Sequence, residues 1–448
     1  MVHHPSPSPV HAPPARPQPA AGDRQSLLNA RIFRRLMPLL VLSYVISFID
    51  RTNIALAKSH IEVDLGISAA AYGLGAGLFF LSYALLEVPS NLIMHRVGAR
   101  FWITRIMVTW GLLSAGMAFI TGETSFYVMR VLLGAAEAGL FPGVMLYLTY
   151  WFGREERARA IGYFLLGVCI ANILSGPVGG ALLQMDGFLG WHGWQWMFVI
   201  EGLPAVALAW VVWKKLPDGP ASAPWLTAAE SREVLQRLQA EQDQQASAGQ
   251  VGHSLRDCLR DRQIWLAILV YFCHQISIYT VIFFLPGIIG TYGQLSPLQI
   301  GTLNSVPWIA AAIGAAWLPR FATHPQRCRR MLLAGLATMA AGLLVAALAG
   351  KASPALGLLG FSLTALMFFV VQSVVFLFPA SRLAGAGLAG GIALVNTCGL
   401  VGGFIGPTVM GMIEQATGST RNGLFIMAGL LVVAALASTR LRQGQETP

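Results

Sequence analysis

Charged side chains are scarce in this sequence. Only 11% of its 448 residues are Asp, Glu, Lys or Arg, whereas 55% are hydrophobic. A soluble globular protein of this length needs far more charge to cover its surface, so the composition excludes that class. The chain is therefore predicted to be an all-α polytopic membrane protein, with the lipid bilayer as its surroundings.

Cysteines are also few, and they do not cluster. The sequence has five, each standing singly, with no CxxC pair and no histidine cluster at metal-ligand spacing. We expect no disulfide framework, no metal site and no cofactor. The sequence also lacks a nucleophile beside a base and a nucleotide-binding motif, which argues against an enzyme.

The N-terminus lacks the apolar run of a secretory signal peptide. Residues 1–30 begin MVHHPSPSPVHAPPARPQPA, a stretch rich in Pro, Ala and Ser, and are predicted to be a disordered cytoplasmic tail.

Apolar stretches long enough to cross a bilayer follow, about one every thirty residues. Twelve are predicted, at 36–57, 72–92, 101–121, 126–151, 160–183, 196–213, 264–291, 299–318, 331–350, 354–379, 388–413 and 423–441. The longest polar interruption divides six spans from six. The predicted organisation is an N-terminal bundle at 31–214, a cytoplasmic linker at 215–262, a C-terminal bundle at 263–442 and a tail at 443–448.

The net charge of +10 reports topology and not nucleic-acid binding. Nearly all Lys and Arg residues fall in alternate segments on one side of the predicted membrane, and the other side receives only Lys58, Lys351 and Arg421. By the positive-inside rule, both termini are predicted to lie in the cytoplasm.

A weak internal repeat supports two pseudo-symmetric halves. Gly176-Pro177 in the fifth span is echoed by Gly406-Pro407 in the eleventh, and Asn172 precedes the first pair much as Asn396 precedes the second. Two six-helix halves with a site between them are typical of secondary transporters.

Two charges interrupt the apolar run at 126–150. Arg130 and Glu137 are seven residues apart, nearly two helical turns, so they share a face of the predicted helix. Each would cost roughly 2.5 to 3.5 kcal/mol facing lipid at mid-membrane, so that face must look into protein or a watery cavity. The alternative to a functional site is a structural ion pair between helices.

The first span carries a second charged group, Asp50-Arg51-Thr52-Asn53. Consecutive helical residues point about 100° apart, so Asp50 is expected to face another helix when Arg51 faces a cavity. With Arg130 and Glu137, the four charges sum to zero. Protonation of a carboxylate would leave a net positive charge and free an arginine to bind an anion.

Several segments resemble the major facilitator superfamily, specifically its anion:cation symporter branch. They are FIDRTNIALA at 48–57, YVMRVLLGAAEAGLFPG at 127–143, GWQWMFVIEGLPA at 193–205 and GLAGGIALVNTCGLVGGFIGP at 387–407. Within the branch, the likeness is to bacterial permeases for tartrate, phthalate and 4-hydroxyphenylacetate. The resemblance implies a twelve-helix fold in two six-helix halves, with Asp50 and Glu137 as the proton-coupling groups and Arg51 and Arg130 as substrate-binding groups.

The segment EVPSNLIMHRVGARFWITR at 87–105 resembles the cytoplasmic signature loop of the superfamily. Asn91 and His95 stand where Gly and Asp are usual, while Arg96, Gly98 and Arg100 fit the pattern. In the second half, His274 stands where an apolar residue is usual, and it could titrate if it lines the cavity.

Polar residues in other spans are candidates for reading the rest of the substrate, although such residues also bond helix to helix. The favoured ones are Tyr83, Asn53, Gln372 and Asn396, and the further ones are His274, Gln275, Tyr279, Asn172 and Ser373.

With this resemblance, the protein is predicted to be a monomeric proton-coupled symporter in the inner membrane of a bacterium, where it imports a small organic carboxylate anion by alternating access. An aromatic acid, a tartrate-like acid and a sugar acid all remain open as the substrate. Alternatives are an exchanger or exporter of similar anions and a non-transporting membrane sensor.

Overall fold

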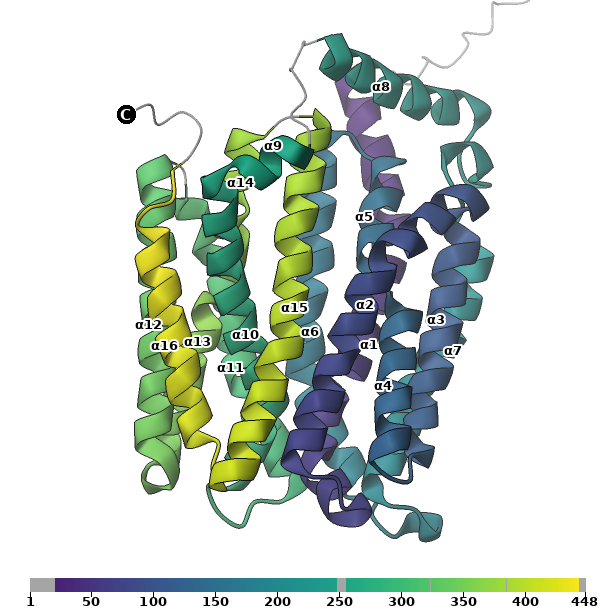
Figure 1. Ribbon diagram of the computed structural model, residues 1–448. Helices are drawn as coiled ribbons and strands as arrows, with labels where there is room; N and C mark the ends of the chain where they lie inside the picture. The colour runs from purple at the N-terminus through teal and green to yellow at the C-terminus, as the bar shows by residue number, and fades with distance from the viewer. Residues whose placement is uncertain (1–20, 248–254, 323, 384, 443–448) are drawn as a thin grey trace, which may run out of the picture.

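The chain forms a bundle of long helices that run roughly side by side (Figure 1). The computed structural model describes residues 21–247, 255–322, 324–383 and 385–442. The first set of helices is α1 (Ala21–Leu65), α2 (Ala69–Val97), α3 (Ala99–Gly116), α4 (Glu123–Glu137), α5 (Leu140–Thr149), α6 (Arg154–Leu183) and α7 (Gly193–Lys215). The second set is α10 (Arg262–Gly290), α11 (Pro297–Trp317), α12 (Pro325–Ala349), α13 (Pro354–Val375), α14 (Leu377–Arg382), α15 (Gly385–Thr417) and α16 (Arg421–Ser438).

The prediction of an all-helical polytopic membrane protein is confirmed. Within the described residues, eleven helices are long and apolar enough to cross a membrane. The predicted span at 299–318 corresponds to α11, which packs between α6 and α13 but is not one of the eleven. It carries Gln299, Asn304 and Pro307, which dilute its apolar character.

The described part of the linker contains two α-helices, α8 (Ala228–Ser247) and α9 (Leu255–Arg260). In Figure 1 α8 crosses the top of the bundle, which we call the linker end; the opposite end is the far end. Arg31 of α1 forms an ion pair with Glu230 of α8, and Arg237 donates to Asn29 at 3.0 Å. These contacts fasten the start of α1 to the linker.

Helix α1 begins ten residues before the predicted boundary. Residues 21–30 are helical and not part of a tail, because Leu28 is buried and Asn29 donates to Glu156 of α6 at 2.6 Å. The predicted disorder of residues 1–20 falls outside the described residues.

The predicted span at 126–151 is broken, contrary to expectation. Helix α4 ends at Glu137, Gly139 has a left-handed φ of 94°, and α5 begins at Leu140. The Ser90 hydroxyl donates to the freed carbonyl of Ala138 at 2.7 Å, and a Cβ at Gly139 would overlap that hydroxyl. Pro142 follows in the first turn of α5, where its missing N–H costs nothing.

The second set of helices repeats this break. The predicted span at 354–379 divides into α13, which ends at Val375, and α14, which begins at Leu377 and has Pro379 as its third residue. The two breaks occupy matching places in the two sets and agree with the internal repeat.

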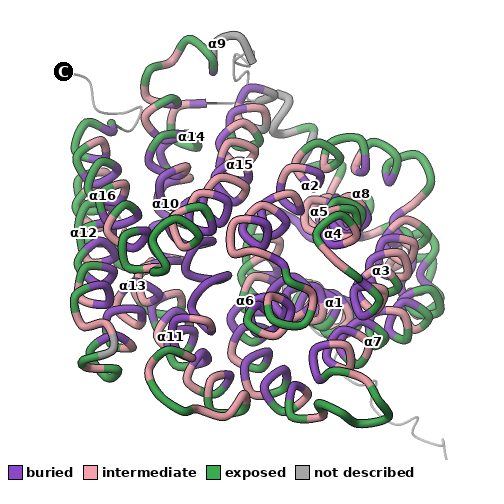
Figure 2. The backbone as a smooth tube through the Cα atoms, turned by 60° about the horizontal axis from the view of Figure 1, so that its bottom comes forward, coloured by how far each residue is buried: buried purple, intermediate pink, exposed green. Residues whose placement is uncertain are grey.

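The two sets of helices meet through small residues. Helix α6 packs on α11, and α15 packs on α2. A Cβ on Gly176 of α6 would overlap the carbonyl oxygen of Gly301 of α11, so only glycine permits this close approach. Figure 2, which brings the far end forward, shows buried residues between the helices and exposed residues on their outer flanks.

Candidate functional site

A buried ion pair joins α1 to the end of α4. Arg51 Nη2 lies 2.5 Å from Glu137 Oε1, and the two side chains are only 8% and 2% exposed. Ser47, one turn before Arg51, donates its hydroxyl to the same oxygen. The helix break therefore presents Glu137 to the first span, and its partner is Arg51, not Arg130.

Aromatic rings enclose the Arg51 guanidinium. Its carbon Cζ lies 4.7 Å from the ring centroid of Phe48 and 5.2 Å from those of Phe79 and Tyr83. Such faces stabilise a guanidinium that has lost most of its water. The ion pair and the rings together stabilise the buried positive charge of Arg51, which would be unfavourable without them.

Asp50 points away from this pair, as the helical spacing predicted. Trp110 Nε1 donates to Asp50 Oδ2 at 2.7 Å, and Ser114 Oγ donates to Oδ1 at 2.8 Å. Both donors lie on α3. Among the ion pairs of the described residues, none includes Asp50, so only neutral donors satisfy its carboxyl group.

Arg130 is 1% exposed and points toward α2. Its guanidinium makes long hydrogen bonds to the carbonyl oxygens of Gly75, at 3.3 Å, and Ala76, at 3.4 Å. Cζ lies 4.9 Å from the Phe79 ring centroid, so one ring contacts both Arg130 and Arg51.

A central cavity of about 100 Å³ lies between the two sets of helices. Arg51 is in its wall. Six further residues that the sequence singled out also line it: Tyr83, Asn172, Gln275, Tyr279, Gln372 and Asn396. They come from α2, α6, α10, α13 and α15, and Asn172 and Asn396 occupy the repeat-related positions. The structure therefore brings together most of the predicted substrate-reading residues.

A larger cavity of about 530 Å³, the linker-side cavity, continues from the central one. The two share Glu87, Phe141 and Gln372, among other lining residues. The larger cavity reaches Pro319, just beyond the linker-end terminus of α11, and also includes Ser373. The site is thus approached from the linker end.

Three of the predicted substrate-binding residues lie outside the linings of these two cavities. Arg130 is one, and Asn53 is another; Asn53 is 1% exposed and faces the interior of the first set of helices. His274 is fully buried behind the wall, where Nδ1 lies 3.1 Å from Gln275 Oε1 and the ring stacks on Phe368. The His274 ring also stacks on Tyr271, so His274 can influence the cavity only indirectly, through lining residues such as Gln275, Phe368 and Tyr271.

The signature loop joins α2 to α3 at the linker end. Gly98 has a φ of 94°, and the backbone N–H of Arg100 donates to Asp218 Oδ1 at 2.9 Å. His95 and Arg96 are exposed, and Asn91 donates to the Glu87 carbonyl oxygen at 3.2 Å. The acidic contact of this loop thus comes from Asp218, after α7.

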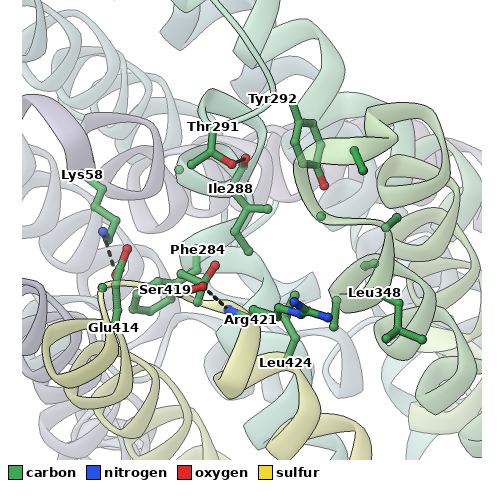
Figure 3. Close-up of a pocket in the computed structure, with 18 residues that line it drawn as sticks. Lys58, Phe284, Ile288, Thr291, Tyr292, Leu348, Glu414, Ser419, Arg421 and Leu424 are labelled. Atoms are coloured by element: carbon green, nitrogen blue, oxygen red, sulfur yellow. Dashed lines mark hydrogen bonds and ion pairs between the residues drawn. The ribbon is translucent and has the colours of Figure 1, made fainter.

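A second buried charge cluster, which the sequence pattern did not predict, is centred on Lys58. Lys58 was assigned to an exposed segment, but it is 5% exposed in α1, and its Nζ lies 2.8 Å from Glu62 and 2.9 Å from Glu414 of α15. Figure 3 shows Lys58 and Glu414 facing each other beside a far-end cavity of about 550 Å³. The i, i+4 spacing of Lys58 and Glu62 was the available signal.

Known proteins resemble this chain along most of its length. Residues 40–407 match the model of the Major Facilitator Superfamily. A putative tartrate transporter of Agrobacterium vitis is 41% identical over 419 residues, 93% of this chain and 95% of that protein. The inner membrane transport protein RhmT of Escherichia coli K12 is 38% identical over 409 residues, 91% of this chain and 94% of that protein.

Solved structures share the fold. A bacterial homologue of the human lysosomal transporter Spinster, in an inward-facing and occupied conformation, has a TM-score of 0.71 at 17% identity. The match covers 96% of this chain and all of that one.

Proposed function

Because this chain belongs to the major facilitator superfamily, a family of membrane transporters and not of enzymes, we propose that it is a proton-coupled symporter. It imports a small organic carboxylate across a bacterial inner membrane, with both termini and the linker in the cytoplasm. The tartrate transporter named above supports the carboxylate class, and the distribution of Lys and Arg supports the orientation.

The buried pair between Arg51 and Glu137 is the observation that carries the proposal. While Glu137 is ionised, it occupies the guanidinium of Arg51 at the wall of the central cavity. A proton on Glu137 removes the charge that holds Arg51, and the guanidinium becomes available to a substrate carboxylate as a bidentate partner. Proton and anion then bind cooperatively, which is the requirement for symport.

Asp50 is the second proton-coupling group in this proposal. Among the described residues, two neutral donors and no cation contact its carboxyl group. The ionised form of Asp50 therefore carries a buried negative charge without a cationic partner, and protonation removes that charge. The four charged residues, Asp50, Arg51, Arg130 and Glu137, sum to zero when all are ionised. Proton binding gives these four residues the net positive charge that an anion neutralises.

Alternating access follows from the two sets of helices. We assign residues 21–214 and 263–442 as the two moving bundles, joined by the linker at 215–262. They rock about the central cavity in a single chain, so a monomer is sufficient.

Uptake into proteoliposomes tests the proposal. A labelled panel of tartrate, a sugar acid, phthalate and 4-hydroxyphenylacetate is offered with and without an inward proton gradient. We expect accumulation of at least one compound, collapsing on addition of a protonophore. Glu137→Gln and Asp50→Asn should abolish gradient-driven accumulation, while Glu155→Gln, an exposed site on α6, should not.

Other outcomes separate the alternatives. Flux seen only as exchange with preloaded anion would make the protein an exchanger, and binding without flux would make it a sensor. Full accumulation by both Glu137→Gln and Asp50→Asn would refute their coupling roles.

A further inference from the structure

We infer that the ligand of the central cavity is a monocarboxylate that carries a hydroxyl group away from its carboxylate, and that dicarboxylates such as tartrate are poor ligands. The inference rests on the proposed function and narrows its substrate class.

Charge in the cavity wall is the first argument. Of the described residues that line the central and linker-side cavities, Arg51 is the only cation and Glu87 the only acid. Arg130 faces the carbonyl groups of α2, and Lys58 lies toward the far end between two carboxylates. Neither can meet an anion that Arg51 holds.

The charge of the cavity wall, as distinct from the charge of the whole group of four residues, therefore favours a monoanion. Once Glu137 is protonated, Arg51 contributes a single positive charge to the cavity, and one carboxylate neutralises it. A second carboxylate would be desolvated without a cationic partner and would share the cavity with Glu87. A buried charge without a partner is strongly disfavoured.

Gln372 supplies the second argument. Its Nε2 donates to the Tyr271 hydroxyl at 3.4 Å, but its Oε1 is buried and has no hydrogen-bond partner among the described residues. A buried, unpaired acceptor in a cavity wall calls for a donor on the ligand. A hydroxyl group can donate to this oxygen, whereas an ionised carboxylate cannot.

The rest of the wall suits the body of such a ligand. Aromatic side chains dominate it: Tyr44, Phe48, Tyr83, Phe141, Tyr271, Tyr279, Trp308, Phe368 and Phe369. Their faces can pack against a planar ring or against the C–H face of a polyol chain. The amides of Asn172, Gln275 and Asn396 offer further partners for hydroxyl groups. A hydroxylated aromatic acid and an aldonate share the required chemistry.

The test compares four probes: 4-hydroxyphenylacetate, phenylacetate, gluconate and tartrate. Uptake is measured in proteoliposomes with an inward proton gradient, and dissociation constants are measured on the purified protein by calorimetry. We expect 4-hydroxyphenylacetate or gluconate to bind at least about tenfold more tightly than tartrate. For the aromatic pair, loss of the hydroxyl should cost about tenfold or more, because Gln372 Oε1 is then left unpaired.

Gln372→Met keeps the length of the side chain and removes the acceptor. If 4-hydroxyphenylacetate is the better ligand, its advantage over phenylacetate should fall toward one, while phenylacetate binding persists. If gluconate is the better ligand, the Gln372→Met variant should bind gluconate more weakly and bind the other probes as before. Gln239→Met, the same change on the exposed face of α8, should leave every ratio unaltered.

Failure of the inference is distinct from failure of the proposed function. Tartrate binding as tightly as the best monocarboxylate would overturn the inference and leave carboxylate symport intact. Equal binding of phenylacetate and 4-hydroxyphenylacetate, with gluconate excluded, would overturn the hydroxyl assignment. If no probe accumulates, the proposal of coupled transport is wrong, and the order of the dissociation constants alone tests the inference. If no probe binds, both the proposed function and the inference are wrong.

Discussion

The Arg51 side chain forms an ion pair with Glu137, is surrounded by aromatic rings and lines the central cavity. Its neighbour Asp50 has none of these contacts, because a single helical step turns it toward α3. Asp50 and Arg51 are adjacent in the sequence, but their side chains therefore lie in different environments. The first span can thus hold a cation that faces the central cavity and a carboxyl group that points away from it within one turn.

Arg51→Lys should separate charge from geometry at this position. Lysine keeps the positive charge, but it cannot form the planar two-point contact with a carboxylate. We expect an increase in the KM for the transported anion of about tenfold, with a retained dependence on the proton gradient. Initial rates across substrate concentrations, with and without the gradient, measure both quantities.

Arg105→Lys is the matched control for that experiment. Arg105 is a half-buried arginine in α3 whose guanidinium lies over Trp102, remote from the central cavity. Its replacement should leave the KM unchanged. An Arg51→Lys protein with the original KM would mean that the guanidinium fork does not hold the substrate.

The sequence predicted these residues better than it predicted their pairing. Helical spacing placed Arg130 and Glu137 on one face, yet Glu137 contacts Arg51 and Arg130 contacts carbonyl groups of α2. Periodicity within a helix gives the direction of a side chain but not which neighbouring helix lies opposite. The partners of Asp50, Trp110 and Ser114, were missed for the same reason.

At the scale of the helix, the break after Glu137 is the feature that shapes the site. Residues 134–143, GAAEAGLFPG, carry the signals of a helix end and a new start, since Gly139 precedes Pro142 by three residues. The apolar run gives no sign of this helix end, because hydropathy predicts burial in the membrane but contains no information about the direction of the backbone. Broken helices inside a membrane require neighbours that satisfy the freed backbone, which here is Ser90.

Gly139→Ala tests the importance of the break. Alanine at this left-handed φ is strained, and its Cβ would overlap the Ser90 hydroxyl, so we expect a loss of about 1 to 3 kcal/mol of stability. Thermal unfolding of the purified protein in detergent should show a lower midpoint. Transport at permissive temperature should fall as well, because Glu137 is two residues away.

Gly429→Ala is the control for that substitution. Gly429 lies in α16 with an ordinary helical backbone, and a Cβ there would meet nothing within 4 Å. We expect an unchanged or slightly higher midpoint, since alanine is the better helix former. Equal midpoints for both variants would indicate that the chain does not need a left-handed residue after Glu137.

For the whole molecule, composition and hydropathy predicted the architecture well. Apolar runs mark where the chain enters lipid, and these runs became the long helices of the two sets. Contacts between the sets were not predictable in this way. The Lys58 cluster needs α1 and α15 to meet at the far end, and a count of cations by side of the membrane placed Lys58 in an exposed segment.

The Lys58 cluster is expected to hold the far end closed while the cavities open at the linker end. Lys58 links α1 to α15 through Glu414, and Gly176 packs on Gly301 toward the same end. Glu414→Gln removes the ion pair that joins the two sets of helices and leaves Lys58 paired with Glu62. The conformation with a closed far end should lose about 1 to 2 kcal/mol of stability relative to the open one, which lowers the ratio of closed to open molecules by roughly five- to thirtyfold.

Spin labels at Val63→Cys and Ala416→Cys, exposed positions on α1 and α15, measure this ratio in a cysteine-free background. The parent protein should give a short, narrow distance distribution, and Glu414→Gln should add a longer component. Arg421→Gln is the matched control, because Arg421 lines the same far-end cavity but belongs to none of the ion pairs of the described residues. A distribution unchanged by Glu414→Gln would show that helix packing alone, through contacts such as that of Gly176 with Gly301, keeps the far end closed.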